Sequence, residues 1–222
     1  MNENHARDEI CRVGQSLFAR GYAHATAGNI SVRLDDGSFL ITPSDACLGF
    51  LEPTQLAKVN AQGEQISGAK ASKTLHLHRH IYAAACQHDA QTRCVIHTHS
   101  THCVALSLRS AGQAELIPPI TPYFVMKVGH VPLLAYHRPG DAAAALAVAD
   151  TIHRYAQKST PIRAVMLARL GPNVWHDSPA TAMATLEELE ETAQLLCLSA
   201  DTPAPLTLTQ IQELRNTFGA RW

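Results

Sequence analysis

The chain is organised around one stretch, Arg93-Cys94-Val95-Ile96-His97-Thr98-His99-Ser100-Thr101. A short apolar run followed by two histidines predicts a buried strand that ends in polar side chains. His97 and His99 are two positions apart, and side chains at this spacing share one face of a strand. Two neutral imidazoles suit Zn²⁺, Mn²⁺, Ni²⁺ or Fe²⁺, but a catalytic metal site usually takes three protein ligands. The pair therefore predicts a metal site whose third ligand comes from elsewhere.

Length and charge narrow the class of protein. The chain has 222 residues, which is enough for one full core, so we expect a single domain over residues 1–222. Lys and Arg total 18 against 19 for Asp and Glu, so no basic field points to a nucleic-acid partner. The first residues lack the apolar core of a signal peptide, and no run reaches transmembrane length. We expect a cytoplasmic protein with no membrane partner.

The six cysteines are scattered and show no C-x-x-C spacing. Such a pattern is typical of reduced thiols in a cytosolic protein rather than of a disulfide framework. The 13 histidines, in contrast, are many for a chain with 17% charged residues, and they favour the metal hypothesis.

Periodicity predicts helices and strands along the whole chain. The expected helices cover residues 7–20, 73–86 with Ser72 as its cap, 101–108, 142–155 and 179–199. The expected strands lie within 26–34, which starts as a turn, and at 38–42, 57–60, 64–68, 131–136, 164–168 and 173–176, together with the one that ends at His97. Asp35-Asp36-Gly37 predicts a hairpin turn between the first two strands, and residues 52–56 are expected to form a short helical turn. Apolar strands mixed with long helices at both ends of the chain imply an α/β/α sandwich. Four acidic residues of the last helix, Glu187, Glu188, Glu190 and Glu191, are most simply expected to form a solvated face, with the alternative that one of them anchors a positively charged neighbour.

Several motifs in a fixed order resemble the class II aldolase and adducin family. They cover nearly the whole chain, and within the family they look closest to the 3-oxo-tetronate 4-phosphate decarboxylase branch. They are Ala27-Gly28-Asn29-Ile30-Ser31, Thr42-Pro43, Ala71-Ser72-Lys73, His97-Thr98-His99-Ser100-Thr101, Tyr136-His137-Arg138-Pro139-Gly140-Asp141, Gly171-Pro172 and Glu187-Glu188-Leu189-Glu190-Glu191.

The resemblance implies a metal-dependent carbon–carbon lyase that acts by aldol cleavage or decarboxylation on a small sugar-acid phosphate. It also implies a central, largely antiparallel sheet and a homotetramer with active sites at subunit interfaces. Bond cleavage leaves an enediolate, whose charge a divalent cation, most simply Zn²⁺, stabilises as a Lewis acid. The implied metal ligands are His97 and His99. The implied phosphate-binding residues, which offer N–H groups, hydroxyls and one cation, are Gly28, Asn29, Thr42, Ser44, Ser72 and Lys73.

Three positions depart from the family pattern. The third metal histidine of the family corresponds to Leu170, which cannot bind a metal. The acid/base glutamate corresponds to Thr74, whose hydroxyl has no useful pKa near neutrality. We keep Lys73 and Thr74 as the catalytic positions. The third departure is Asp45, whose carboxylate opposes phosphate binding.

These departures leave alternatives open. A nearby histidine can complete the metal site, and the candidates are His78, His102, His130, His137 and His176, although most histidines are surface or hydrogen-bonded residues rather than ligands. Substrate or water can also fill the missing position in an altered reaction. The alternative from another functional class is a protein without catalytic activity, with a binding or structural role on the same fold.

Overall fold

One mixed sheet forms the centre of the protein. The computed structural model describes residues 2–110, 112–201 and 203–222, and its sheet has eight strands in the order β4-β3-β2-β1-β5-β8-β7-β6. Only the edge pair β6–β7 is parallel. The strands are β1 (Asn29–Arg33), β2 (Phe39–Ile41), β3 (Ala57–Val59), β4 (Gln65–Ser67), β5 (Cys94–His97), β6 (Leu133–Leu134), β7 (Ala164–Leu167) and β8 (Gly171–His176).

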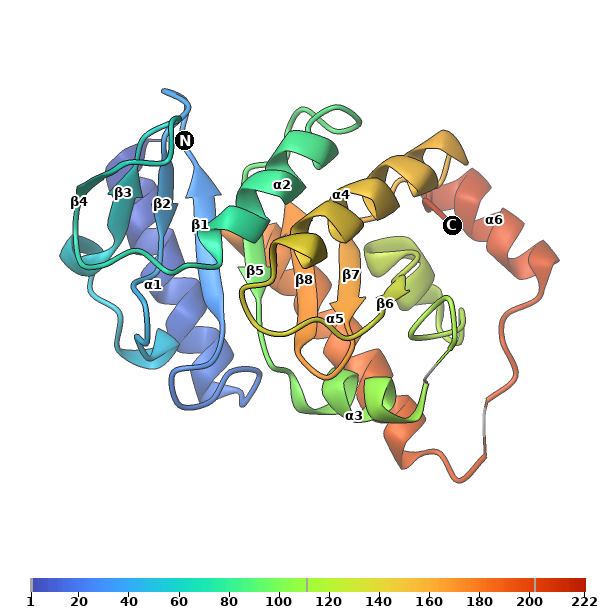
Figure 1. The fold of residues 1–222 in the computed structure, drawn as a ribbon. Helices are drawn as coiled ribbons and strands as arrows, with labels where there is room; N and C mark the ends of the chain where they lie inside the picture. Colours follow the sequence, from blue (N-terminus) through green and yellow to red (C-terminus); the bar gives the residue numbers. More distant parts are fainter. Residues whose placement is uncertain (1, 111, 202) are drawn as a thin grey trace.

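Helices cover both faces of this sheet, which confirms the expected α/β/α sandwich (Figure 1). On one face lie α1 (Glu3–Ala19), α3 (Thr101–Arg109) and α5 (Pro179–Leu198), and on the other α2 (Leu75–Ala85) and α4 (Ala142–Gln157). Alternation along β5 explains the two cores, because Ile96 joins the core under α1 and α5 whereas Val95 joins the core under α2 and α4. The strand that carries His97 is therefore buried on both sides.

The hairpin between β1 and β2 forms where the sequence predicts a turn. The Asp36 carboxylate accepts the N–H of Ser38 at 2.9 Å, and Gly37 adopts a φ of +80°, which a glycine reaches without strain. On β1 the hydroxyl of Ser31 faces α2, where it contacts Nδ1 of His78 at 2.8 Å. On its other edge β1 pairs with β5, which sets Asn29 opposite His97 and places the start of β1 beside the end of β5.

Helix boundaries differ from the predictions at two starts. The first helix begins at Glu3, four residues before the predicted start, because the Asn2 side chain caps it by accepting the N–H of Asn4. The helix predicted from residue 73 begins at Leu75. The Ser72 hydroxyl accepts the N–H of Thr74 at 3.3 Å, so Ser72 closes a turn before the helix. Lys73 and Thr74 therefore lie in this turn rather than on α2.

Four further elements add to the predicted set. They are two short helical turns, η1 (Leu48–Phe50) and η2 (Pro53–Gln55), the π-helical turn η3 (Phe124–Val128) and the C-terminal α6 (Leu208–Phe218). The turn at η2 was expected, whereas η3 and α6 were not. Among the described residues, no helix is both long and apolar enough to span a bilayer. The six cysteines are free thiols, as expected.

One of the four acidic residues of α5, Glu190, does not belong to a solvated face. Glu190 is only 4% exposed, and its two carboxylate oxygens accept the backbone N–H groups of His102 at 2.8 Å and Cys103 at 3.0 Å. It thus neutralises the positive end of α3. Glu187 pairs with Arg20, and Glu191 accepts the hydroxyl of Tyr22 at 2.6 Å. The prediction was wrong for Glu190, because it considered α5 without the elements packed against it, whereas the expected contact of one acid with a cation is made by Glu187.

Candidate active site

A cavity of about 510 Å³ opens at one end of the sheet, and we call it the histidine cavity. It lies where β5 and β7 end and where β1 and β8 begin, and the first turns of α2 and α4 complete it. Its volume falls in the range of small-molecule sites. His97 and His99 both line it, so the histidine pair predicted from the sequence faces a space that can admit a substrate.

His97 is held in one tautomer by the backbone. Its Nδ1 lies 2.9 Å from the carbonyl oxygen of Pro172, and because a carbonyl only accepts, Nδ1 must carry the hydrogen. Nε2 therefore keeps its lone pair, as in a metal-binding histidine oriented by a second partner. Burial, reinforced by His99, lowers the pKa of His97 to about 4, so the ring is neutral near pH 7.

His99 stands beside His97 with ring centroids 5.1 Å apart and planes at 67°. Burial, followed by the neighbouring His24, lowers the pKa of His99 as well. Two neutral imidazoles at this separation suit a divalent cation, because bonds of about 2.0–2.1 Å from one zinc to two tetrahedral ligands place the ring centroids about 5–6 Å apart. Within residues 2–110, 112–201 and 203–222, however, no three His, Cys, Asp or Glu side chains gather closely enough to hold a metal as they stand.

Two glycines hold the histidine segment from both sides. A Cβ on Gly28 would lie 2.9 Å from the carbonyl oxygen of His97, and a Cβ on Gly171 would lie 1.9 Å from that of Thr98. Both residues also have positive φ, +90° and +142°. Only glycine permits such close approach, which explains why glycines stand directly before β1 and at the first position of β8. These contacts fix the backbone on which the histidines stand.

Of the predicted site residues, Thr42 lies outside the cavity and the others line it. Thr42 does not reach the cavity, because its side chain is buried. Its hydroxyl accepts the N–H of Ile30 at 3.2 Å and so stabilises the backbone of β1. The Ser44 hydroxyl lines the cavity but donates to the carbonyl oxygen of Ala71 at 3.0 Å. The predicted residues that line the cavity are Gly28, Asn29, Ser44, Ser72, Lys73, Thr74, His97 and His99.

The rim of the cavity carries more positive than negative charge. Lys70, Lys73 and Arg138 are exposed cations that line it, against the carboxylates of Asp45 and Asp141. Asp141 is already engaged, because its carboxylate caps α4 by accepting the N–H of Ala143 at 3.0 Å. Lys70 and Arg138 were missed as site residues, although the quoted Arg-Pro-Gly-Asp motif contained the signal. The rim suits an anionic ligand such as a phosphate or a carboxylate.

The two departures from the family pattern both face the histidine cavity. Leu170 lines it and also packs against the core under α2 and α4. Thr74 lines it from the turn before α2, where its side chain makes no capping hydrogen bond. The cavity thus has a leucine and a threonine at the positions where the resemblance implies a ligand and an acid/base.

The five histidines considered as replacements do not line this cavity. His78 is buried against Ser31, and its Nε2 is buried with no hydrogen-bond partner. The other four are paired with other side chains: His102 with Glu190, His130 with Glu115, His137 with Asp141, and His176 with Arg163 and Asp177. We therefore assign none of them to the site.

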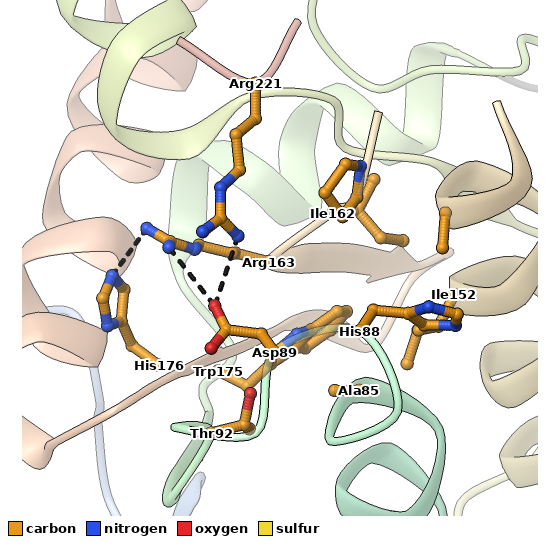
Figure 2. A pocket seen from close by; sticks show the side chains of 12 residues that line it. Ala85, His88, Asp89, Thr92, Ile152, Ile162, Arg163, Trp175, His176 and Arg221 are labelled. Atoms are coloured by element: carbon orange, nitrogen blue, oxygen red, sulfur yellow. Dashed lines mark hydrogen bonds and ion pairs between the residues drawn. The ribbon is translucent and has the colours of Figure 1, made fainter. Parts of the chain in front are cut away.

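A second cavity lies at the opposite end of β5 and β8, and charged side chains close it (Figure 2). The carboxylate of Asp89 lies between the guanidinium groups of Arg163 and Arg221, at 3.5 Å and 3.2 Å. Arg163 also contacts Nε2 of His176 at 2.7 Å. Only about 10 Å³ remains free, so this cluster anchors the C-terminal segment rather than binding a substrate.

Comparison with known proteins agrees with this arrangement. Residues 8–197 match the model of the class II aldolase and adducin N-terminal domain. A 3-oxo-tetronate 4-phosphate decarboxylase from Cupriavidus necator is 51% identical over 99% of both chains. The crystal structure of YgbL from Klebsiella pneumoniae superposes with a TM-score of 0.85 at 41% identity, covering 97% of this chain and all of that one. An L-fuculose-1-phosphate aldolase from Thermus thermophilus gives a TM-score of 0.72 at 29% identity, covering 86% and 92%.

Proposed function

Because this chain belongs to the class II aldolase and adducin family, we propose that it is a carbon–carbon lyase that decarboxylates a small phosphorylated 3-oxo sugar acid. The class of lyase agrees with relatives that are named decarboxylases. The preferred substrate is a 3-oxo-tetronate 4-phosphate, as in the names of those relatives. The observation that carries the choice of reaction is Thr74 at the cavity wall.

Thr74 favours decarboxylation over aldol cleavage. In a 3-oxo acid the bond to the carboxyl carbon breaks, CO₂ leaves, and the electron pair moves onto the neighbouring carbon and the ketone oxygen. A proton from water then completes the product. The reaction starts from a carboxylate that is already ionised, whereas aldol cleavage must first remove a hydroxyl proton and therefore needs a base. A site with a threonine at the base position suits the reaction that can start without a base.

The residues present fit a divalent cation, which the family generally uses. His97 and His99 would hold it, because both rings are neutral near pH 7 and His97 has its Nε2 lone pair free. When bound, the cation supplies Lewis-acid stabilisation of the negative charge that develops on the ketone oxygen. Zn²⁺ is the best candidate because it prefers imidazole ligands, and Mn²⁺, Ni²⁺ and Fe²⁺ are the others.

The cationic rim would orient the two anionic ends of such a substrate. Lys73 and Lys70 lie near the turn that leads into α2, while Arg138 approaches from the loop before α4. The backbone of Gly28 and the amide of Asn29 line the floor between them. We assign the phosphate to the side of Gly28, Asn29, Ser72 and Lys73, as the resemblance implies, which leaves Arg138 for the opposite side of the cavity.

An activity assay tests this proposal. Metal-free protein is reloaded with Zn²⁺, Mn²⁺, Ni²⁺ or Fe²⁺, and CO₂ release from a 3-oxo-tetronate 4-phosphate is measured beside cleavage of a ketose 1-phosphate. We expect CO₂ release that His97→Ala abolishes and that His5→Ala, an exposed histidine of α1, leaves unchanged. Absence of CO₂ release with all four metals would overturn the proposal.

The alternative is a catalytically silent binding protein on the same fold, and Leu170 together with Thr74 favours it. Metal analysis of the protein as isolated separates the two. Substoichiometric metal that His97→Ala does not change supports the silent protein, whereas stoichiometric metal that His97→Ala removes supports the lyase. A homotetramer in the cytoplasm is part of the lyase proposal, and light scattering in solution measures the subunit number.

A further inference from the structure

We infer that His24 supplies the third protein ligand of the metal site, in place of the histidine that Leu170 has replaced. The inference rests on the proposed metal-dependent function. The ring of His24 lies edge-on to that of His99, with centroids 6.4 Å apart and planes at 70°. His99 in turn lies 5.1 Å from His97. The ring of His24 thus lies next to the histidine pair on the side of His99, just outside the residues that line the histidine cavity.

The backbone turn that carries His24 is well defined. After α1 the chain reverses through Tyr22, whose N–H donates to the carbonyl oxygen of Leu17 at 2.9 Å. The carbonyl of His24 then accepts the N–H of Ala27 at 2.9 Å, and Ala25 adopts a φ of +48°. This turn leads directly into Gly28, which packs against the carbonyl of His97. His24 is therefore tied to the histidine segment through a short stretch of ordered backbone.

The side chain of His24 is free to move towards His99 and the metal. It is exposed, and no hydrogen bond or ion pair engages its ring within the described ranges. Zinc bonds of about 2.0–2.1 Å place the ring centroids of two ligands about 5–6 Å apart, so the 6.4 Å separation from His99 must shrink by roughly 1 Å. Rotation about the side-chain bonds of an exposed histidine gives such a shift without moving the backbone.

Other side chains are less suitable as the third ligand. Leu170 faces the cavity but has no donor atom. The ring of His78 is fully buried, and its Nδ1 is already engaged with the hydroxyl of Ser31 at 2.8 Å. His76 does line the cavity, yet its ring packs against His80 on the exposed side of α2, with centroids 4.6 Å apart. His24 combines an exposed ring, engaged by no hydrogen bond within the described ranges, with a position beside His99, so it is the best placed.

Metal affinity of three variants tests the assignment without relying on activity. Zn²⁺ dissociation constants are measured by competition with a chromophoric chelator for wild type, His24→Ala, His24→Phe and the control His76→Ala. We expect both His24 variants to lose at least about 10- to 100-fold in affinity, the loss known for removal of outer-shell partners alone. His76→Ala should bind as wild type. Co²⁺ substitution provides a second readout, because loss of one nitrogen ligand changes the visible spectrum.

The double variant His24→Ala/Leu170→His makes the test sharper. If both positions supply the same ligand, adding a histidine at residue 170 should restore the affinity that His24→Ala removes. Thermal unfolding of the metal-free proteins checks that each variant folds. Unchanged affinity in His24→Ala, with loss in His97→Ala, would overturn the inference and leave the proposed function standing. Failure of wild type to bind any metal would instead overturn the proposed function.

Discussion

Nδ1 of His97 donates its hydrogen to the carbonyl oxygen of Pro172 across 2.9 Å. The first residues of β8 thereby set the orientation of a predicted metal ligand that lies 75 residues earlier in the chain. The strand begins with Gly171, which approaches Thr98 so closely that a Cβ would lie 1.9 Å from its carbonyl oxygen. The geometry of the histidine pair therefore depends on a glycine that is not itself a ligand.

Gly171→Ala should disturb both stability and metal binding. The added Cβ must push Thr98 and Pro172 apart, and the backbone must keep a φ of +142° that L side chains rarely adopt. We expect a loss of unfolding free energy of about 1–3 kcal/mol and weaker Zn²⁺ binding. Gly37→Ala is the control, because a Cβ there meets nothing within 4 Å despite a φ of +80°. Wild-type metal affinity in Gly171→Ala would show that the start of β8 does not determine the geometry of the histidine pair.

Glu190→Gln should destabilise the protein although it keeps the shape of the side chain. The buried carboxylate accepts two backbone N–H groups at the start of α3, and the amide offers only one acceptor oxygen there and places a donor against an N–H. We expect urea unfolding to show a loss of about 1–3 kcal/mol. Glu187→Gln on the same helix removes only a surface pair with Arg20 and should cost less than about 1 kcal/mol. Equal losses of unfolding free energy in the two variants would show that the burial of Glu190 does not cause the destabilisation.

Acid should destabilise the protein through His78. Burial, followed by His97, lowers the pKa of His78 from 6.5 to about 3 in the folded state. Between these two values the unfolded chain binds a proton that the folded protein does not, so stability is complete above about pH 6.5 and falls as the pH drops towards 3. The slope contributed by one such group is at most about 1.4 kcal/mol per pH unit.

Replacement of His78 by an apolar residue measures this contribution. His78→Leu removes the titrating ring, so its unfolding free energy should depend less steeply on pH between 6.5 and 4 than that of wild type. The dependence should not vanish, because burial and His99 lower the pKa of His97 in the same direction. Denaturant titrations at several pH values give the comparison, and parallel pH profiles for the two proteins would argue against a titrating His78.

Lys73→Ala and Arg138→Ala should each weaken binding of a phosphorylated sugar acid. Both cations are exposed at the rim of the cavity, so loss of one charge-assisted contact should raise KM about 10-fold, and less at high salt. Lys158→Ala is the matched control, because this exposed lysine lies over the ring of Tyr155 away from the histidine cavity. An unchanged KM in both rim variants would remove them from the substrate site.

Restoring the family residues tests why the site departs from the pattern. Thr74→Glu/Leu170→His supplies a base and a ligand in the cavity that both side chains line. We expect this variant to gain cleavage of a ketose 1-phosphate, because aldol cleavage needs the base that decarboxylation does not. If the double variant binds metal but cleaves no aldol substrate, other residues determine the reaction.

Local pattern alone determined most of the elements and the centre of the site. The alternation around Asp36 and Gly37 predicted the hairpin, and the spacing of His97 and His99 predicted a pair on one face, because strand geometry is a property of neighbouring residues. The resemblance to the family, and not local pattern, identified Leu170 and Thr74 as departures, and both face the cavity.

Tertiary structure decided which distant groups meet. Glu190 has the sequence context of a solvated helix residue, and only the packing of α5 against α3 turns it into a buried cap. Thr42 belongs to a site motif, yet pairing of β2 with β1 directs its hydroxyl to Ile30. His24 is 75 positions from His99, and no spacing rule relates them. Their approach depends on the sheet order that places β1 beside β5, because contacts between remote residues follow from packing and not from local periodicity.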